Sequence, residues 1–177
     1  MRLRSLTHLL ESVQSLAHPE QIVVLGSSAL LPIDPRLGET GQPLEFSYDA
    51  DLLVTPIDPE QAAILVESLG QESLFSKRHG YYADILRAEI IETLPRGWES
   101  RLVPVPRHSN SFALNPYDLA LVKLIIGRRK DIDLLHQLLA RSVINADSLR
   151  EHYQQAVLSE SEAVKAGRNL RALLAHE

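Results

Sequence analysis

The sequence contains no cysteine, and only one methionine and one tryptophan occur among its 177 residues. Without cysteine the chain has no disulfide framework, no zinc–thiolate site and no cysteine nucleophile, which agrees with a reducing cytoplasm. No apolar run reaches the length of a membrane-spanning helix, and the first residues lack the long apolar core of a signal peptide. We therefore expect a cytoplasmic protein without membrane contact.

An excess of positive charge is also missing. The chain carries 18 Lys and Arg against 23 Asp and Glu, a formal net charge of −5. Broad nonspecific binding to DNA needs a basic surface that neutralises phosphates, so the composition argues against it while leaving room for a local basic patch. Hydrophobic and charged residues make up 45% and 23% of the chain, ordinary values for a globular protein that buries a core.

The spacing of apolar residues predicts an α/β half followed by a helical half. Helical periodicity predicts helices over residues 3–17 and 59–69, and short β-branched or aromatic runs indicate strands between and after them. From residue 115 onward the pattern is helical. We predict a small mixed β-sheet flanked by helices in residues 1–114 and a helical region in residues 115–177, packed on this core. The strands are expected over residues 21–25, 48–54, 80–86, 101–105 and 111–114.

The most informative segment is SYDADLLV, residues 47–54, because it places two carboxylates one residue apart at the start of an apolar strand. Side chains of a strand alternate between its faces, so Asp49 and Asp51 point the same way. Two such acids repel each other unless a cation lies between them, and Mg²⁺ suits the position because it takes one or two protein carboxylates together with substrate phosphates. The alternative is a solvated pair of acids at a strand end.

A third acid, Asp84, is the only charged residue of its predicted strand. A lone buried carboxylate needs a partner. It either joins the acidic pair as a third ligand in a two-metal site, lies exposed on an edge strand, or forms an ion pair with an arginine. The candidate arginines are Arg78, Arg87 and Arg101.

Gly26 and Ser27 follow the first predicted strand directly and precede a short helix. Glycine lets the backbone approach a ligand closely, and N–H groups at a helix start attract phosphate, although such turns also arise for structural reasons alone. Lys123 is the only cation in the apolar sector of its predicted helix. Either its stem packs while the ammonium reaches water, or it contacts phosphate.

At this point the residues resemble a family. Gly26-Ser27, then Asp49-x-Asp51, then Asp84 on a later strand is the order found in the nucleotidyltransferase fold shared with DNA polymerase β. The segments YYADIL, LPRGWESRLVPV and NPYDLALVKLIIGRRKD resemble AbiEii-type and related uncharacterised bacterial nucleotidyltransferases. The resemblance covers roughly residues 21–139.

The resemblance implies magnesium-dependent transfer of a nucleoside monophosphate from an NTP to an acceptor hydroxyl on tRNA, a protein or a small molecule. It assigns the triphosphate to Gly26 and Ser27, and two Mg²⁺ ions to Asp49 and Asp51. Asp84 would be the third metal ligand and would help to deprotonate the acceptor. These are expectations carried over from the family.

The resemblance also extends to the helical half. It implies that Lys123 contacts the nucleotide phosphates, together with Arg128 and Lys130, and that Asp131 orients Lys123 or a nearby base. Read without the family, Arg128, Arg129 and Lys130 either bind phosphates or a nucleic-acid backbone, or form a solvated helix start, which is the interpretation favoured for Arg129. Asp131 caps the helix that follows in the simplest interpretation. The family resemblance further implies a cognate partner protein, as in a toxin–antitoxin pair.

Two other classes of function stay open on the sequence. The chain can be a catalytically inactive binding or antitoxin-like module that keeps the nucleotidyltransferase fold, with acids that hold no metal. A nuclease or phosphatase using the same acids is the weaker option, because such sites usually recruit histidines. The histidines here, His79, His108 and His136 among them, show no metal-ligand spacing.

Overall fold

The computed structural model describes residues 1–175 and separates into two compact units. The first, here called the sheet unit, comprises residues 1–90 and 102–114. The second, the helical unit, comprises residues 91–101 and the chain from Asn115 onward. The segment 91–101 therefore clusters with the later helices, although it lies between two strands of the sheet in sequence.

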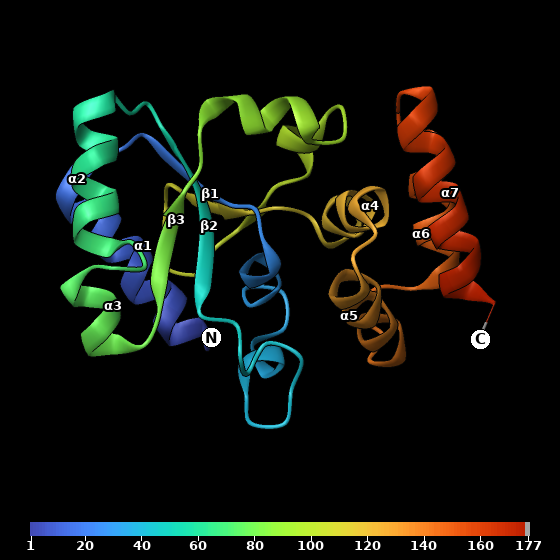
Figure 1. Ribbon diagram of the computed structural model, residues 1–177, viewed down its shortest axis with the longest axis horizontal. Coiled ribbons are helices and arrows are strands. Elements are labelled where there is room, and N and C mark those ends of the chain that lie inside the picture. Colours follow the sequence, from blue (N-terminus) through green and yellow to red (C-terminus); the bar gives the residue numbers. More distant parts are fainter. Residues whose placement is uncertain (176–177) are drawn as a thin grey trace. The chain divides into compact units, whose positions relative to one another are not determined.

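The sheet unit is built on a five-stranded mixed sheet with the order β3-β2-β1-β5-β4 (Figure 1). Strand β2 runs antiparallel to β1 and parallel to β3, while β1 pairs in parallel with β5 and β4 pairs antiparallel with β5. The predicted mixed sheet is confirmed. The strands are β1 (Gln21–Val24), β2 (Asp49–Thr55), β3 (Tyr82–Ile85), β4 (Val103–Pro104) and β5 (Ser111–Ala113).

Helices α1 (Leu3–Ala17) and α2 (Pro59–Leu69) lie side by side, and α2 packs against β3 (Figure 1). Helix α1 has the predicted bounds and buries its leucine and valine stripe. Helix α2 begins at a capping box in which Asp58 accepts from the Gln61 amide, with Pro59 in its first turn, so its start is set locally.

Two elements of the sheet unit were not predicted. Helix α3 (Leu74–His79) buries none of its residues, so no apolar stripe marks it, and it is defined by a Ser73 cap and a left-handed Gly80 at φ 75°. The predicted loop 32–45 contains the short 3₁₀ turn η2 (Pro35–Gly38), where the Asp34 carboxylate accepts from the Arg36 amide.

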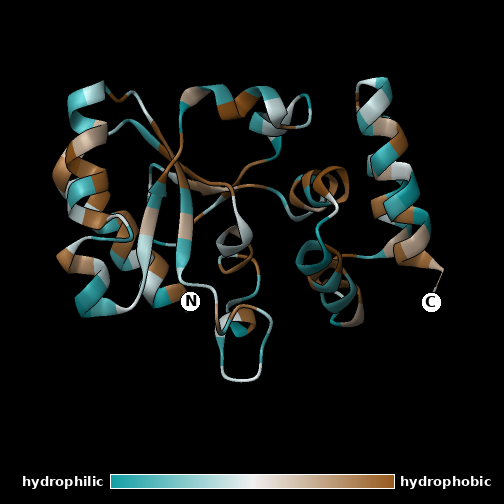
Figure 2. Cartoon of the chain, in the orientation of Figure 1, coloured by the Kyte–Doolittle hydropathy of each residue, from teal (hydrophilic) through white to brown (hydrophobic). Residues whose placement is uncertain are grey.

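The helical unit contains α4 (Pro116–Ile126), α5 (Arg129–Ala140), α6 (Ala146–Gln155) and α7 (Glu160–Leu174). Helix α4 contacts the other three and is strongly hydrophobic (Figure 2). The predicted helix signals are confirmed: Asn115 caps α4, Gly127 ends it at φ 68°, and Ser159 forms a capping box with Glu162.

The remaining short elements are 3₁₀ turns: η1 (Ser27–Leu30), η3 (Ala88–Thr93) and η4 (Trp98–Arg101). Among residues 1–175, no helix is both long enough and apolar enough to span a membrane.

Candidate functional site

Three carboxylates converge at one place on the sheet unit. One oxygen each from Asp49, Asp51 and Asp84 lies within 4.8 Å of the others. The register explains this closeness, because Asp51 stands directly opposite Asp84 in the parallel pair of β2 and β3, and Asp49 lies two residues earlier on the same face. Within residues 1–175 this is the only group of three or more His, Asp or Glu side chains close enough to share a metal ion.

Two of the three alternatives raised by the sequence hold together for Asp84, because it lies close to Asp49 and Asp51 and is also exposed on the edge strand β3. The side chain is exposed, and no ion pair in the described part of the chain joins it to an arginine. Arg101, one of the candidate partners, instead binds Asp118 in the helical unit. Asp84 therefore contributes its charge to the cluster with Asp49 and Asp51.

The donor set suits a hard divalent cation. All three ligands are carboxylate oxygens, and Asp49 and Asp51 are half-buried while Asp84 is open to solvent. Oxygen-only sets of this kind favour Mg²⁺ or Mn²⁺ over metals that prefer nitrogen or sulfur. The exposed side leaves room for ligands that the protein does not supply.

Gly26 is required by the position of Asp51. A β-carbon at residue 26 would overlap Oδ2 of Asp51, so only glycine leaves the carboxylate its present place. The backbone of Gly26 has φ −79°, which any residue adopts, so the constraint is space and not conformation. The Leu25 amide donates to the Asp51 carbonyl at 2.9 Å and fixes this approach. The sequence suggested that the glycine lets the backbone approach a ligand; in the structure the glycine makes room for the Asp51 carboxylate.

Ser27 begins the turn η1, which packs against β2. The next residue, Ser28, has a buried hydroxyl without a hydrogen-bond partner in residues 1–175. A buried polar atom of this kind is usually satisfied by water or by a ligand oxygen. The three converging carboxylates, with a glycine that makes room for Asp51, indicate a binding site, and the residues present fit a divalent cation.

Tyr82 was missed by the sequence analysis. It pairs with Asp49 across β2 and β3 and lies on the same face as Asp84. Burial raises the pKa of the Tyr82 phenol, and the charges of Asp49, Asp84 and Asp51 raise it further. The phenol therefore stays protonated beside the acids. Its position two residues before Asp84 was the available signal.

The predicted phosphate-binding residues of the helical half form an ionic cluster of their own. Lys123 is only 7% exposed, and its ammonium donates to Asp131 at 3.0 Å. The Arg128 guanidinium binds the same carboxylate at 2.7 Å. The ammonium is buried and does not extend to water. The alternative in which the stem packs while the ammonium is solvated is therefore not observed. Burial raises the pKa of Asp131, but the bonds from Arg128 and Lys123 outweigh it, so the pKa lies below its usual value.

The two other cations of this segment extend into solvent. Arg129 contacts Asp133 at 3.9 Å from a side chain that is 96% exposed, a pair that contributes little. Lys130 is exposed. Both begin helix α5.

A second ionic network lies inside the helical unit. The Asp118 carboxylate of α4 is fully buried and accepts from Arg101 at 2.8 and 2.9 Å and from His152 Nε2 at 2.8 Å. Burial acts to raise the pKa of Asp118, but the bonds from His152 and Arg101 outweigh it and leave the pKa below its ordinary value. This network joins the segment 91–101 to α4 and α6.

We predict that Asp118→Asn lowers the free energy of unfolding of the helical unit by about 3 kcal/mol at neutral pH, because two half-buried donors lose their charged and fully buried acceptor. The folded-state pKa lies below the ordinary 3.8, so this stabilisation is present above pH 3.8 and is lost as the pH falls through the folded-state value. Urea denaturation followed by circular dichroism at several pH values measures it.

The matched control is Asp147→Asn, which alters a carboxylate that is 96% exposed and paired with Arg150 in the same unit. It should change stability by less than about 1 kcal/mol. A loss at Asp118→Asn no larger than this control, or a loss that grows below pH 3.8, contradicts the assignment.

The fold and the acid cluster together describe an α/β protein with three carboxylates of β2 and β3 close enough to share a divalent cation. The sequence model of one family, described as nucleotidyltransferase of unknown function (DUF6036), matches residues 1–174. The chain therefore belongs to this nucleotidyltransferase family, as the residues predicted. The finer resemblance to AbiEii-type proteins stays a prediction. No curated protein and no solved structure matches the chain.

Proposed function

We propose that the protein is a magnesium-dependent nucleotidyltransferase that moves a nucleoside monophosphate from an NTP to an acceptor hydroxyl. The observation that carries the proposal is the convergence of Asp49, Asp51 and Asp84 within 4.8 Å on one face of the sheet, in a chain of this family. Two Mg²⁺ ions held there would neutralise the phosphates and activate the acceptor oxygen.

The residues themselves have separable tasks. Asp49 and Asp51 hold the cations, and Gly26 keeps Asp51 in place. Ser27 and the backbone of η1 lie beside Asp51 and contact the triphosphate. In the reaction the acceptor oxygen bonds to the α-phosphorus, the bond to pyrophosphate breaks, and the acceptor proton passes to Asp84, the carboxylate that is open to solvent. Catalysis here is positioning and charge neutralisation.

For the helical unit we propose that Lys123 contacts the nucleotide phosphates, assisted by Arg128 and Lys130. Asp131 holds both Lys123 and Arg128, which supports a role in orienting them. Because the sequence resembles AbiEii-type proteins, we also propose a toxin–antitoxin role with a cognate protein. The alternative is an inactive module that keeps the fold; the glycine that makes room for Asp51 favours the enzyme.

The proposal predicts that the full-length protein transfers label from α-³²P-labelled NTPs to cellular RNA, protein or small molecules in Mg²⁺. The double variant Asp49→Ala, Asp51→Ala should transfer none, because both cations lose their shared ligands. Calorimetry with Mg²⁺ and a non-hydrolysable NTP separates the enzyme from the inactive module, which binds neither. Absence of transfer by the wild type, or equal transfer by the double variant, would falsify the proposal.

A further inference from the structure

The phenol of Tyr82 lies among the three acids. In the parallel pair of β2 and β3, Tyr82 stands opposite Asp49. Asp84 follows two residues later and stands opposite Asp51, so the side chains of both pairs leave the sheet on the same face. The charges that act on the phenol are those of Asp49, Asp84 and Asp51. The acid-bearing face of the sheet therefore carries a fourth functional group, a hydroxyl on an aromatic ring.

The Tyr82 hydroxyl makes no hydrogen bond within residues 1–175. The side chain is half-buried, and the amide of Tyr82 donates to the Tyr48 carbonyl at 2.9 Å, which holds the residue in register. Ionised carboxylates only accept hydrogen bonds, yet the phenol donates to none of its acidic neighbours. A half-buried donor of this kind is usually completed by water or by a ligand oxygen. The hydroxyl is therefore available to a molecule that binds over the acids.

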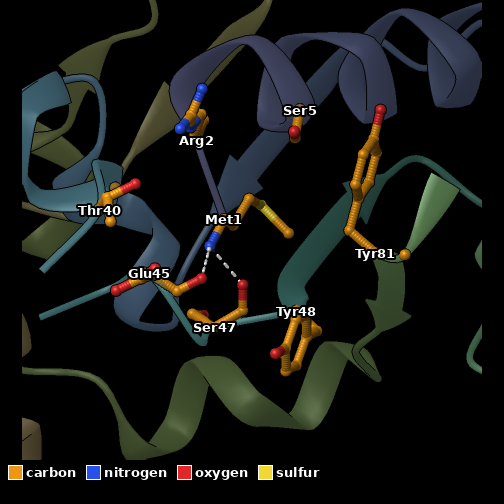
Figure 3. A pocket seen from close by; sticks show the side chains of 10 residues that line it. Met1, Arg2, Ser5, Thr40, Glu45, Ser47, Tyr48 and Tyr81 are labelled. Carbon is orange, nitrogen blue, oxygen red and sulfur yellow. Dashed lines mark hydrogen bonds between the residues drawn. The ribbon is translucent and has the colours of Figure 1, made fainter. Parts of the chain in front are cut away.

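The neighbouring tyrosine, Tyr81, is directed to the other face of the sheet. Its hydroxyl shares a hydrogen bond with Nδ1 of His8 in α1 at 2.8 Å, and its ring contacts Phe75 and His79 of α3. Figure 3 shows Tyr81 on the side of α1, where it lines a cavity. Adjacent residues of an extended chain point to opposite faces, so Tyr82 shares the face of the acids and Tyr81 does not.

The order of the strands places Tyr82 on one side of the reaction. Strand β3 is an edge of the sheet, β2 lies next to it, and β1 with the Gly26-Ser27 turn lies on the far side of β2. With the triphosphate beside that turn, pyrophosphate leaves on the β1 side. An in-line displacement brings the attacking oxygen in from the opposite side. That is the side of β3, where Asp84 is open to solvent.

We propose that Tyr82 is an acceptor-binding residue, whose hydroxyl donates a hydrogen bond to the acceptor molecule next to the oxygen that Asp84 deprotonates. The role in binding the acceptor rests on the proposed function, whereas the place of Tyr82 beside the acids does not. The acids hold the cations, the Gly26-Ser27 turn contacts the triphosphate, and Tyr82 orients the group that is modified. The competing role is packing alone, in which the ring supports β3 and the hydroxyl has no partner in the reaction.

The place of Tyr82 is tested without catalysis. The full-length protein is made with 3-fluorotyrosine, so that its five tyrosines give separate fluorine NMR signals. The variants Tyr82→Phe and Tyr81→Phe assign the two signals of interest. Bound Mn²⁺ broadens the signals of nearby nuclei, with an effect that falls steeply with distance. We expect Mn²⁺ to broaden the Tyr82 signal far more than the Tyr81 signal, and Asp51→Ala to remove this difference. Equal broadening of the two signals, or none, overturns the assignment.

The role of Tyr82 is tested in Mg²⁺ with α-labelled NTP. The acceptor probe is whichever cellular fraction, RNA, protein or small molecules, the wild type labels most strongly. Tyr82→Phe keeps the ring and removes only the hydroxyl. This variant should lower kcat/KM for the acceptor fraction about tenfold, the effect of one lost hydrogen bond. Its affinity for Mg²⁺ with a non-hydrolysable NTP, measured by calorimetry, should equal that of the wild type.

Tyr81→Phe is the matched control, because it removes the adjacent phenolic hydroxyl, which is bonded to His8 on the other face. It should leave kcat/KM for the acceptor fraction unchanged. Equal kcat/KM for Tyr82→Phe and the wild type, or a parallel loss of affinity for Mg²⁺-NTP in Tyr82→Phe, overturns the acceptor role. The proposed function fails separately, when the wild type binds no Mg²⁺-NTP and labels no fraction.

Discussion

Asp51→Asn is expected to lower the rate of nucleotidyl transfer about a thousandfold, because a metal that supplies several kcal/mol of transition-state stabilisation loses a shared ligand. The same variant should be at least as stable as the wild type without metal. Its carboxylate lies within 4.8 Å of two others, and removing one charge relieves their repulsion. Radiolabel transfer and thermal unfolding with and without Mg²⁺ measure both effects.

The rate of transfer and the thermal stability, measured together, distinguish acids that bind a metal from acids that only support the fold. Mg²⁺ should raise the melting temperature of the wild type by mass action and should leave that of Asp51→Asn almost unchanged. Glu72→Gln, at an exposed acid of the same unit, controls for the loss of one negative charge. If Asp51→Asn unfolds more easily in EDTA and still responds to Mg²⁺, the acids serve the fold and the metal assignment is wrong.

Gly26→Ala should reduce transfer about a hundredfold while preserving the fold. The backbone conformation accepts alanine, but the new β-carbon overlaps Oδ2 of Asp51 and must displace it. Displacement of a catalytic group by about 1 Å is enough for a loss of this size. The affinity for Mg²⁺, measured by calorimetry, should fall in parallel with the rate.

Gly41→Ala is the matched control for Gly26→Ala. Gly41 has φ 77° with open space around a β-carbon, so alanine there costs backbone energy without touching the acids. We expect Gly41→Ala to lose stability and to keep its Mg²⁺ affinity, the reverse of Gly26→Ala. Unchanged metal affinity in Gly26→Ala would show that Asp51 can move without consequence.

Elements with local signals could be predicted from the sequence. Helix α2 has a capping box and Pro59, α4 lies between Asn115 and Gly127, and α1 carries a continuous apolar stripe. Helix α3 has no buried residue, so periodicity did not reveal it. The rule that works for helices packed on a core does not apply to a short surface helix.

The candidate site was predictable to the extent that it follows from strand geometry. Alternation alone places Asp49 and Asp51 on one face, but the closeness of Asp84 depends on the register of β2 against β3, which pairs it with Asp51. The same register brings Tyr82 opposite Asp49. Register is set by contacts between distant parts of the chain, so the sequence could place Tyr82 on the face of Asp84 but could not show that it lies opposite Asp49.

The ionic partners in the helical unit could not be predicted from the sequence either. Asp118 binds Arg101 and His152, which lie 17 and 34 residues away, and no local pattern selects those partners from the other cations. For Lys123 the sequence offered a solvated ammonium or a phosphate contact. The buried bond to Asp131 was not among these readings, although the family resemblance suggested that Asp131 orients the lysine.

The central claim is that Asp49, Asp51 and Asp84 hold divalent cations against a nucleotide triphosphate. A crystal structure of the full-length protein soaked with Mg²⁺ and a non-hydrolysable NTP tests it most directly. The account predicts metal density ligated by all three carboxylates, with the triphosphate beside Gly26 and Ser27. A nucleotide bound elsewhere, or acids without metal while the nucleotide is in place, would contradict it.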